Sequence, residues 1–74
     1  QRWGLAAKGF AAKGGWGPGL RGDYLVRQFG MVPAASGHVG VALAAQANSF
    51  EAGVDVLNTM ADWLLNHLPD LAEQ

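Results

Sequence analysis

Apolar side chains recur along the last third of the chain at intervals of 4, 3, 4, 3 and 4 residues. This spacing places them on one face of an α-helix. The residues of this stripe are Phe50, Val54, Leu57, Ala61, Leu64 and Leu68. We expect the helix to start directly after Asn48, which forms a capping-box pattern with Glu51, and to end before Pro69.

The apolar surface of this helix is wider than a single stripe. A second stripe runs beside the first and consists of Val56, Met60 and Trp63. The residues that clearly face water are Glu51, Asp55, Asn58, Asp62 and Asn66. So wide an apolar surface needs a sheet or several helices to cover it, and a chain of 74 residues offers little that can do so.

Composition excludes several classes of function. The chain has no cysteine, and its two histidines, His38 and His67, have no third ligand near them, so we expect no metal and no disulfide. All five cations lie in the first 27 residues, but glycines separate them, so they form no dense patch for nucleic acid. We expect them to be neutralised by the acids of the C-terminal half or by a partner. Residues 31–47 come nearest to a membrane span, and Pro33, His38 and Gln46 argue against one.

The first part of the chain is rich in glycine, and we expect strands in the residues that follow it. Seven of the eleven glycines lie in residues 4–22. Residues 24–29 alternate as a strand that Gly30 closes, and residues 33–37 read as a turn. Residues 39–47 are too short and too uniformly apolar for periodicity to separate helix from strand.

The segment Lys13-Gly14-Gly15-Trp16 combines a cation with backbone that a ligand can approach closely. Glycine has no Cβ, so its peptide N–H groups can come near a bound group. A cation beside exposed N–H donors suits an oxyanion or a carboxylate. We therefore take this segment as the candidate site.

These residues, in this order, resemble the C-terminal end of a known superfamily. The pattern Lys13-x-Gly15-Trp16-x-Pro18, with Trp3-Gly4 upstream and a strand at residues 24–30, is similar to class A β-lactamase-like and penicillin-binding-protein-like serine hydrolases, in their actinobacterial Lys-x-Gly-Trp variant. The resemblance covers essentially all of residues 1–74. It implies an α+β fold of three antiparallel strands and a long terminal helix. The Lys-x-Gly motif would end the first strand, and residues 39–47 would form the third.

The resemblance also assigns roles to the candidate site. Lys13 would hold the substrate carboxylate or assist proton transfer, and Gly15 would let the substrate lie against the strand edge. The N–H of Trp16 would donate to the oxyanion, a contact worth about 3 kcal/mol in the transition state. Gly14 departs from the pattern, because the family has Thr or Ser there. The missing hydroxyl points away from β-lactam hydrolysis and leaves a related amide or ester as the substrate.

The family's nucleophile motif, Ser-x-x-Lys, is absent from the chain, since no lysine follows Lys13. The resemblance therefore implies that residues 1–74 are the last part of one longer domain, whose remainder carries the nucleophile. This chain would not be catalytic alone. Such enzymes use no cofactor, bind small molecules and are secreted or held in the cell envelope.

Two alternatives from other classes stay open. The chain could be a small Gly/Ala-rich secreted peptide of the bacteriocin type, which is disordered in buffer and helical on lipid. It could also be a structural subunit that docks its terminal helix into a larger complex. The two differ in what covers the wide apolar face of the helix: lipid in the first case, and a larger complex in the second.

Overall fold

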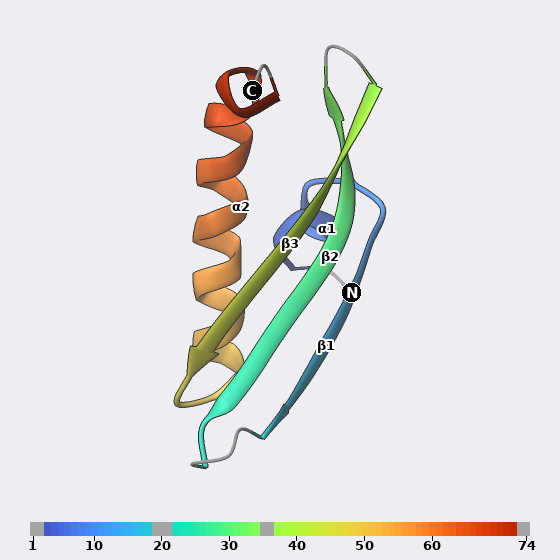
Figure 1. Ribbon diagram of the computed structural model, residues 1–74. Helices are drawn as coiled ribbons and strands as arrows, with labels where there is room; N and C mark the ends of the chain where they lie inside the picture. The colour runs from blue at the N-terminus through green and yellow to red at the C-terminus, as the bar shows by residue number, and fades with distance from the viewer. Residues whose placement is uncertain (1–2, 19–21, 35–36, 73–74) are drawn as a thin grey trace.

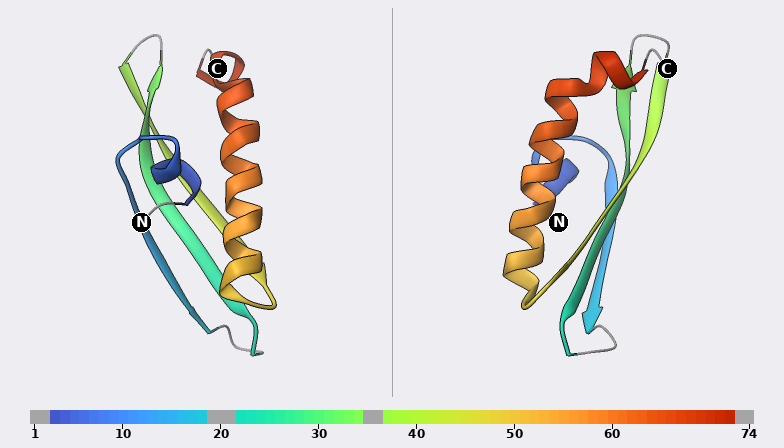
Figure 2. Two further views of the ribbon diagram at one scale, coloured as in Figure 1. Left: turned by 180° about the vertical axis from the view of Figure 1, so that it is seen from behind. Right: turned by 60° about the vertical axis from the view of Figure 1, so that its left-hand side comes forward.

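The chain forms a three-stranded antiparallel sheet with both of its helices on one face (Figures 1 and 2). The computed structural model describes residues 3–18, 22–34 and 37–72, with side chains as far as Leu68. The elements are α1 (Gly4–Ala7), β1 (Ala12–Pro18), β2 (Tyr24–Ala34), β3 (Gly37–Ala47) and α2 (Phe50–Ala72). This arrangement confirms the expected α+β fold.

The sheet has the order β1-β2-β3, so β2 is central and the other two strands are edges. β1 pairs with β2 from Ala12 opposite Gly30 to Pro18 opposite Tyr24. β2 pairs with β3 along its whole length, from Tyr24 opposite Ala47 to Ala34 opposite Gly37. Residues 39–47 are therefore a strand, as the resemblance implied.

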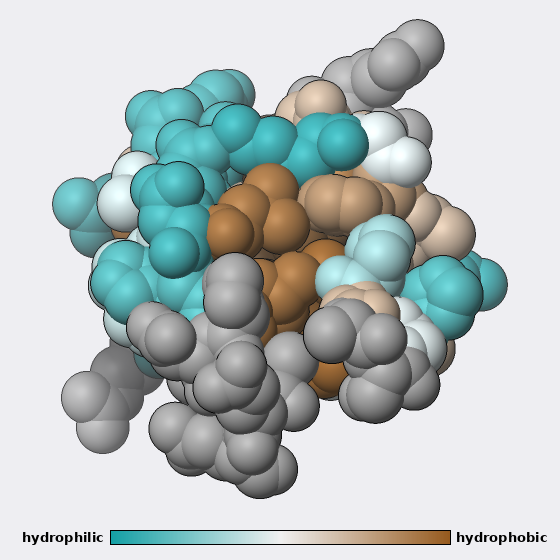
Figure 3. Space-filling view, turned by 90° about the horizontal axis from the view of Figure 1, so that it is seen from above, coloured by the Kyte–Doolittle hydropathy of each residue, from teal (hydrophilic) through white to brown (hydrophobic). Residues whose placement is uncertain are grey.

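Alternation along the strands separates a buried face from an open one. The face under the helices carries the fully buried Val26 and Val32 and the nearly buried Leu43. These pack with Leu5 of α1 and with Leu57 and Ala61 of α2 to form the core. Seen from the end where the β2–β3 hairpin turns, apolar side chains are still visible at the centre of the molecule (Figure 3).

β2 is longer than the sequence predicts, because it continues through Gly30 and Pro33. A Cβ at Gly30 would come within 2.9 Å of the Ala11 carbonyl oxygen and of Leu5 Cδ1, so this glycine is needed for close packing rather than for a turn. Pro33 is tolerated because β1 pairs no further along β2 than Gly30. At Pro33 no strand lies on the β1 side of β2, so no N–H donor is needed there. The expected strand end at Gly30 is wrong. Pro33, Ala34 and Gly37 of the expected connection belong to strands, and residues 35–36 lie outside the described residues.

β1 also differs from the expectation. The Lys-x-Gly motif lies at the start of β1 and not at its end, since the strand runs from Ala12 to Pro18. α1, a single turn that the sequence did not indicate, precedes it. Gly4 starts this turn with φ +58°, a backbone conformation that residues other than glycine rarely adopt.

α2 differs from the prediction at both ends. The Ala52 N–H donates to Ser49 Oγ over 3.1 Å, so Ser49 is the N-cap and the capping box expected from Asn48 is wrong. The helix also continues past Pro69 to Ala72, and its last turn leaves the axis of the preceding turns (Figure 2). Proline lacks the N–H that an interior helical residue donates, which is the usual cause of such a bend.

The buried stripe of α2 is as predicted, but one polar residue of the helix is not exposed as expected. Leu57 and Ala61 are fully buried, and the other stripe residues pack against the core. Asn58, expected in water, is half-buried and accepts the Gly4 N–H over 2.6 Å. Lys8 pairs with Asp62, so one cation of the N-terminal half is neutralised by an acid of the C-terminal half.

Candidate functional site

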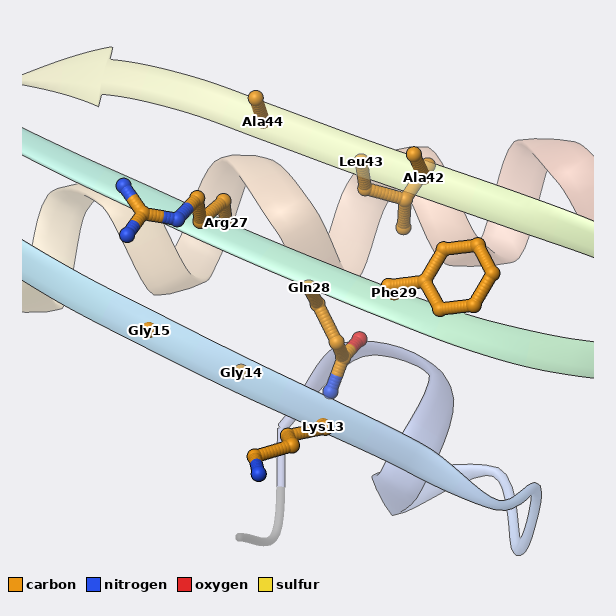
Figure 4. A pocket seen from close by; sticks show the side chains of 9 residues that line it. All are labelled: Lys13, Gly14, Gly15, Arg27, Gln28, Phe29, Ala42, Leu43 and Ala44. Atoms are coloured by element: carbon orange, nitrogen blue, oxygen red, sulfur yellow. The ribbon is translucent and has the colours of Figure 1, made fainter.

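The residues of the candidate site lie along β1, and two neighbouring strands extend the site across the sheet. A shallow groove of about 480 Å³ runs over the sheet face that turns away from both helices (Figure 4). Its lining residues are Lys13, Gly14, Gly15, Arg27, Gln28, Phe29, Ala42, Leu43 and Ala44. The small residues keep it shallow, and the long ones rise around it.

Strand pairing explains which side chains meet in the groove. Lys13 lies opposite Phe29, and Gly15 lies opposite Arg27. Phe29 and Arg27 lie in turn opposite Ala42 and Ala44 of β3. Cross-strand partners share a face of the sheet, so these side chains all belong to the open face.

Gly15 leaves room for the arginine. A Cβ built at Gly15 would lie 3.5 Å from Nε and from a terminal nitrogen of Arg27, which means that the guanidinium group spans the space above this glycine. Two cationic side chains, from neighbouring strands, thus border the same groove (Figure 4). The sequence left the direction of Arg27 open, and the antiparallel register decides it.

The ring of Trp16 lies away from the groove. Its ring packs against Phe50 of α2 at a centroid distance of 5.1 Å, on the helix side of the sheet, although the residue is 55% exposed. The Met31 N–H donates to the Ala11 carbonyl over 3.1 Å, and this bond shows which backbone groups of β1 pair with β2. The N–H and C=O groups of the odd-numbered residues of β1 point to β2. Those of Gly14 and Trp16 therefore point to the free edge of β1.

Gln28 anchors the floor of the groove from below. Its side chain is 2% exposed, accepts the Leu5 N–H over 2.7 Å and donates to the Trp3 carbonyl over 2.9 Å. These bonds tie α1 to β2 directly beneath Gly14, which lies opposite Gln28. No pattern in the sequence indicates this buried amide, because α1 was not expected.

The arrangement is suited to binding an anion, because two cationic side chains line the groove. The lining residues include no serine, cysteine, histidine or carboxylate. Within the described residues, the hydroxyl of Ser49 caps α2, and no group of three metal-binding side chains occurs. Ser36 lies outside the described residues. Neither helix of the described residues has the combination of length and hydropathy that a membrane span requires.

Comparison of the chain with protein-family models, with curated proteins and with solved structures found no match.

Proposed function

We propose that this chain supplies part of the active site of a serine hydrolase of the β-lactamase/DD-peptidase superfamily. Its substrate is a β-lactam or a related amide or ester, and the nucleophilic serine belongs to the remainder of the domain. One observation carries the proposal: Lys13 and Arg27 border one groove, while the Trp16 N–H points to the adjoining strand edge.

The chemistry divides between the groove and the edge. Lys13 and Arg27 supply two positive charges for the carboxylate that such substrates carry, and a charged hydrogen bond contributes about 1.5–3 kcal/mol. The N–H of Trp16 donates to the carbonyl oxygen that becomes negative when the absent serine attacks. With no serine among the residues that line the groove, acyl transfer depends on a nucleophile in the remainder of the domain.

Gly14 favours an amide or ester other than a β-lactam. The related enzymes carry a hydroxyl at this position, and here the backbone alone is available. The side of Gly14 that would bear a side chain is the helix side, since the residue lies opposite the buried Gln28. Recognition of the substrate along the edge therefore rests on the N–H and C=O groups of Gly14 and Trp16.

The test is intact mass spectrometry of the chain isolated from its source, before and after incubation with a fluorescent penicillin and with a fluorophosphonate. The expected result is a co-purifying companion that gains the mass of one probe. A chain of 7.7 kDa that has no companion and takes up no probe contradicts the proposal. Lys13→Ala should slow labelling of the companion, and Lys8→Ala is the matched control, because Lys8 pairs with Asp62 away from the groove.

A helix-docking structural subunit remains the second candidate, and one observation favours it. Val56 and Trp63 of α2 are 43% and 54% exposed, so part of the helix surface is uncovered. This candidate predicts a stable complex that active-site probes do not label. The same mass spectrometry separates it from the hydrolase.

A further inference from the structure

The groove on the open face of the sheet has a charged side and an apolar side. Its volume of about 480 Å³ lies within the range of about 300–1,000 Å³ that is usual for small-molecule sites. The proposed function gives a role only to the charged side, which binds the substrate carboxylate. The apolar side belongs to the same groove and indicates what else the substrate carries.

The charged side lies over β1. The side chain of Arg27 starts on β2 and reaches over Gly15, where a Cβ would lie 3.5 Å from its Nε. Lys13, on β1 itself, lines the groove on the same side. The lining residues include no carboxylate that would neutralise these two cations, so a bound anion is expected over β1.

The apolar side lies over β3. The ring of Phe29, also on β2, leans the other way, since a Cβ built at Gly40 of β3 would lie 3.6 Å from Cζ of the ring. The Sδ atom of Met31 lies near the same point, 3.8 Å from that Cβ. Phe29 is 57% exposed, and its ring lies flat over the sheet with one face open (Figure 4). An exposed ring face is a surface on which a second ring can stack.

The floor between the two sides offers no polar side chain. Ala42 and Ala44 face the groove, whereas Gln28 and Leu43 are buried on the helix side. Along this stretch β2 pairs with a strand on each side, so its backbone groups already have partners. The part of a ligand that crosses the floor is therefore apolar.

The separation of the two sides sets the length of the ligand. β1 and β3 lie on either side of β2, so two strand spacings, about 10 Å in total, separate them. A carboxylate held over β1 and a ring stacked on Phe29 are separated by the same distance. A ligand whose carboxylate is attached close to its ring cannot reach both sides.

We propose that the groove binds a substrate with a carboxylate over β1 and an aromatic group over β3, about 10 Å apart. Lys13 and Arg27 bind the carboxylate, and Phe29 stacks on the aromatic group. This inference rests on the proposed function, in which the cleaved bond lies at the free edge of β1. The carboxylate then lies between that bond and the aromatic group, so both groups are on the same side of the cleaved bond.

The first experiment is an NMR titration of the 74-residue chain with 6-phenylhexanoate, whose extended chain can span the groove. Hexanoate lacks the ring, 6-phenylhexanamide lacks the charge, and phenylacetate is too short to reach both sides. We expect hexanoate to bind about 2- to 12-fold more weakly than 6-phenylhexanoate, and the amide about 10- to 150-fold more weakly. Phenylacetate should bind no more tightly than acetate. Equal dissociation constants for 6-phenylhexanoate and hexanoate overturn the inference.

Variants of Phe29 test where the ring of the ligand binds. Phe29→Ala should remove the advantage of 6-phenylhexanoate over hexanoate, and Phe29→Tyr, which keeps the ring face, should retain it. Trp63→Ala is the matched control, because Trp63 is 54% exposed, almost as much as Phe29, but lies on α2. Both side chains are exposed, so all three variants should keep the fold, which the dispersion of the same spectra checks. An advantage that survives Phe29→Ala and disappears with Trp63→Ala overturns the inference.

The second experiment separates this inference from the proposed function. In the assembled hydrolase, 6-phenylhexanoate should compete with a fluorescent penicillin better than hexanoate does, and Phe29→Ala should remove the difference. Labelling of the companion with equal competition by the two acids leaves the hydrolase in place and overturns the aromatic side of the groove. A ring preference in the titration without any labelled companion overturns the proposed function and leaves a groove that binds aryl carboxylates.

Discussion

The side-chain amide of Gln28 accepts the backbone N–H of Leu5 over 2.7 Å, and this contact joins the N-terminal turn to the central strand. Leu5 itself is fully buried against that strand. The groove is built on the same strand pair, since Gly14 lies opposite Gln28. The geometry of the candidate site therefore depends on a polar contact on the far side of the sheet.

Replacing this amide should be costly. Gln28→Met keeps the length of the side chain but leaves the buried Leu5 N–H without an acceptor and removes one of the two donors to the Trp3 carbonyl, which keeps the Ala7 N–H. We expect a loss of about 2–3 kcal/mol in the free energy of unfolding. The matched control is Gln46→Met, which removes only a solvent-exposed hydrogen bond to Asp23 and should cost about 0.5 kcal/mol. Urea denaturation measures both, and equal losses would contradict the role of Gln28.

Gly53 should not tolerate alanine, although alanine favours helices. A Cβ at Gly53 would come within 2.5 Å of Val26 Cγ2, in the buried contact between α2 and β2. We expect Gly53→Ala to destabilise the fold by about 1–2 kcal/mol. Gly40→Ala is the control, because its Cβ would meet nothing closer than 3.6 Å and should leave stability unchanged or slightly raised. A stabilised Gly53→Ala protein would show that α2 can move away from the sheet.

The N-cap of α2 can be assigned by mutation. Ser49→Ala removes the hydroxyl that accepts the Ala52 N–H and should cost about 1 kcal/mol in thermal or urea unfolding. Asn48→Ala removes the cap that the sequence pattern indicates and should cost only a few tenths of a kcal/mol. If Asn48→Ala costs more stability than Ser49→Ala, the N-cap is Asn48, as the capping-box pattern predicts.

The two cations at the groove should act together on an anionic ligand. In the assembled hydrolase, Lys13→Ala and Arg27→Ala should each slow acylation by a carboxylate-bearing penicillin about 10- to 150-fold, the equivalent of one charged hydrogen bond. Lys8→Ala should leave the rate unchanged, because Lys8 pairs with Asp62 elsewhere. If only Lys13 matters, Arg27 does not contact the substrate.

The candidate site was only partly predictable. Lys13, Gly15 and the Trp16 backbone follow from a local motif, and the structure places Lys13 and Gly15 in one groove. Arg27 joins them only because β2 pairs with β1 in a register that sets it opposite Gly15. No local signal carries that register, since it depends on residues about a dozen positions apart.

The sequence by itself determined the elements whose pattern repeats locally. The stripe through Leu57 and Ala61 determined the buried face of α2, and alternation in residues 24–29 determined the two faces of β2. Periodicity is sufficient there because one side of each element has to leave water.

Only the tertiary structure decided the rest. Leu5-Ala-Ala-Lys-Gly and Phe10-Ala-Ala-Lys-Gly are nearly the same sequence, yet the first forms α1 and the second leads into β1. Gln28 and Asn58 hold the first as a turn, while pairing with β2 extends the second. Short segments of this kind have little preference of their own, so the hydrogen-bond partners supplied by distant residues decide their conformation.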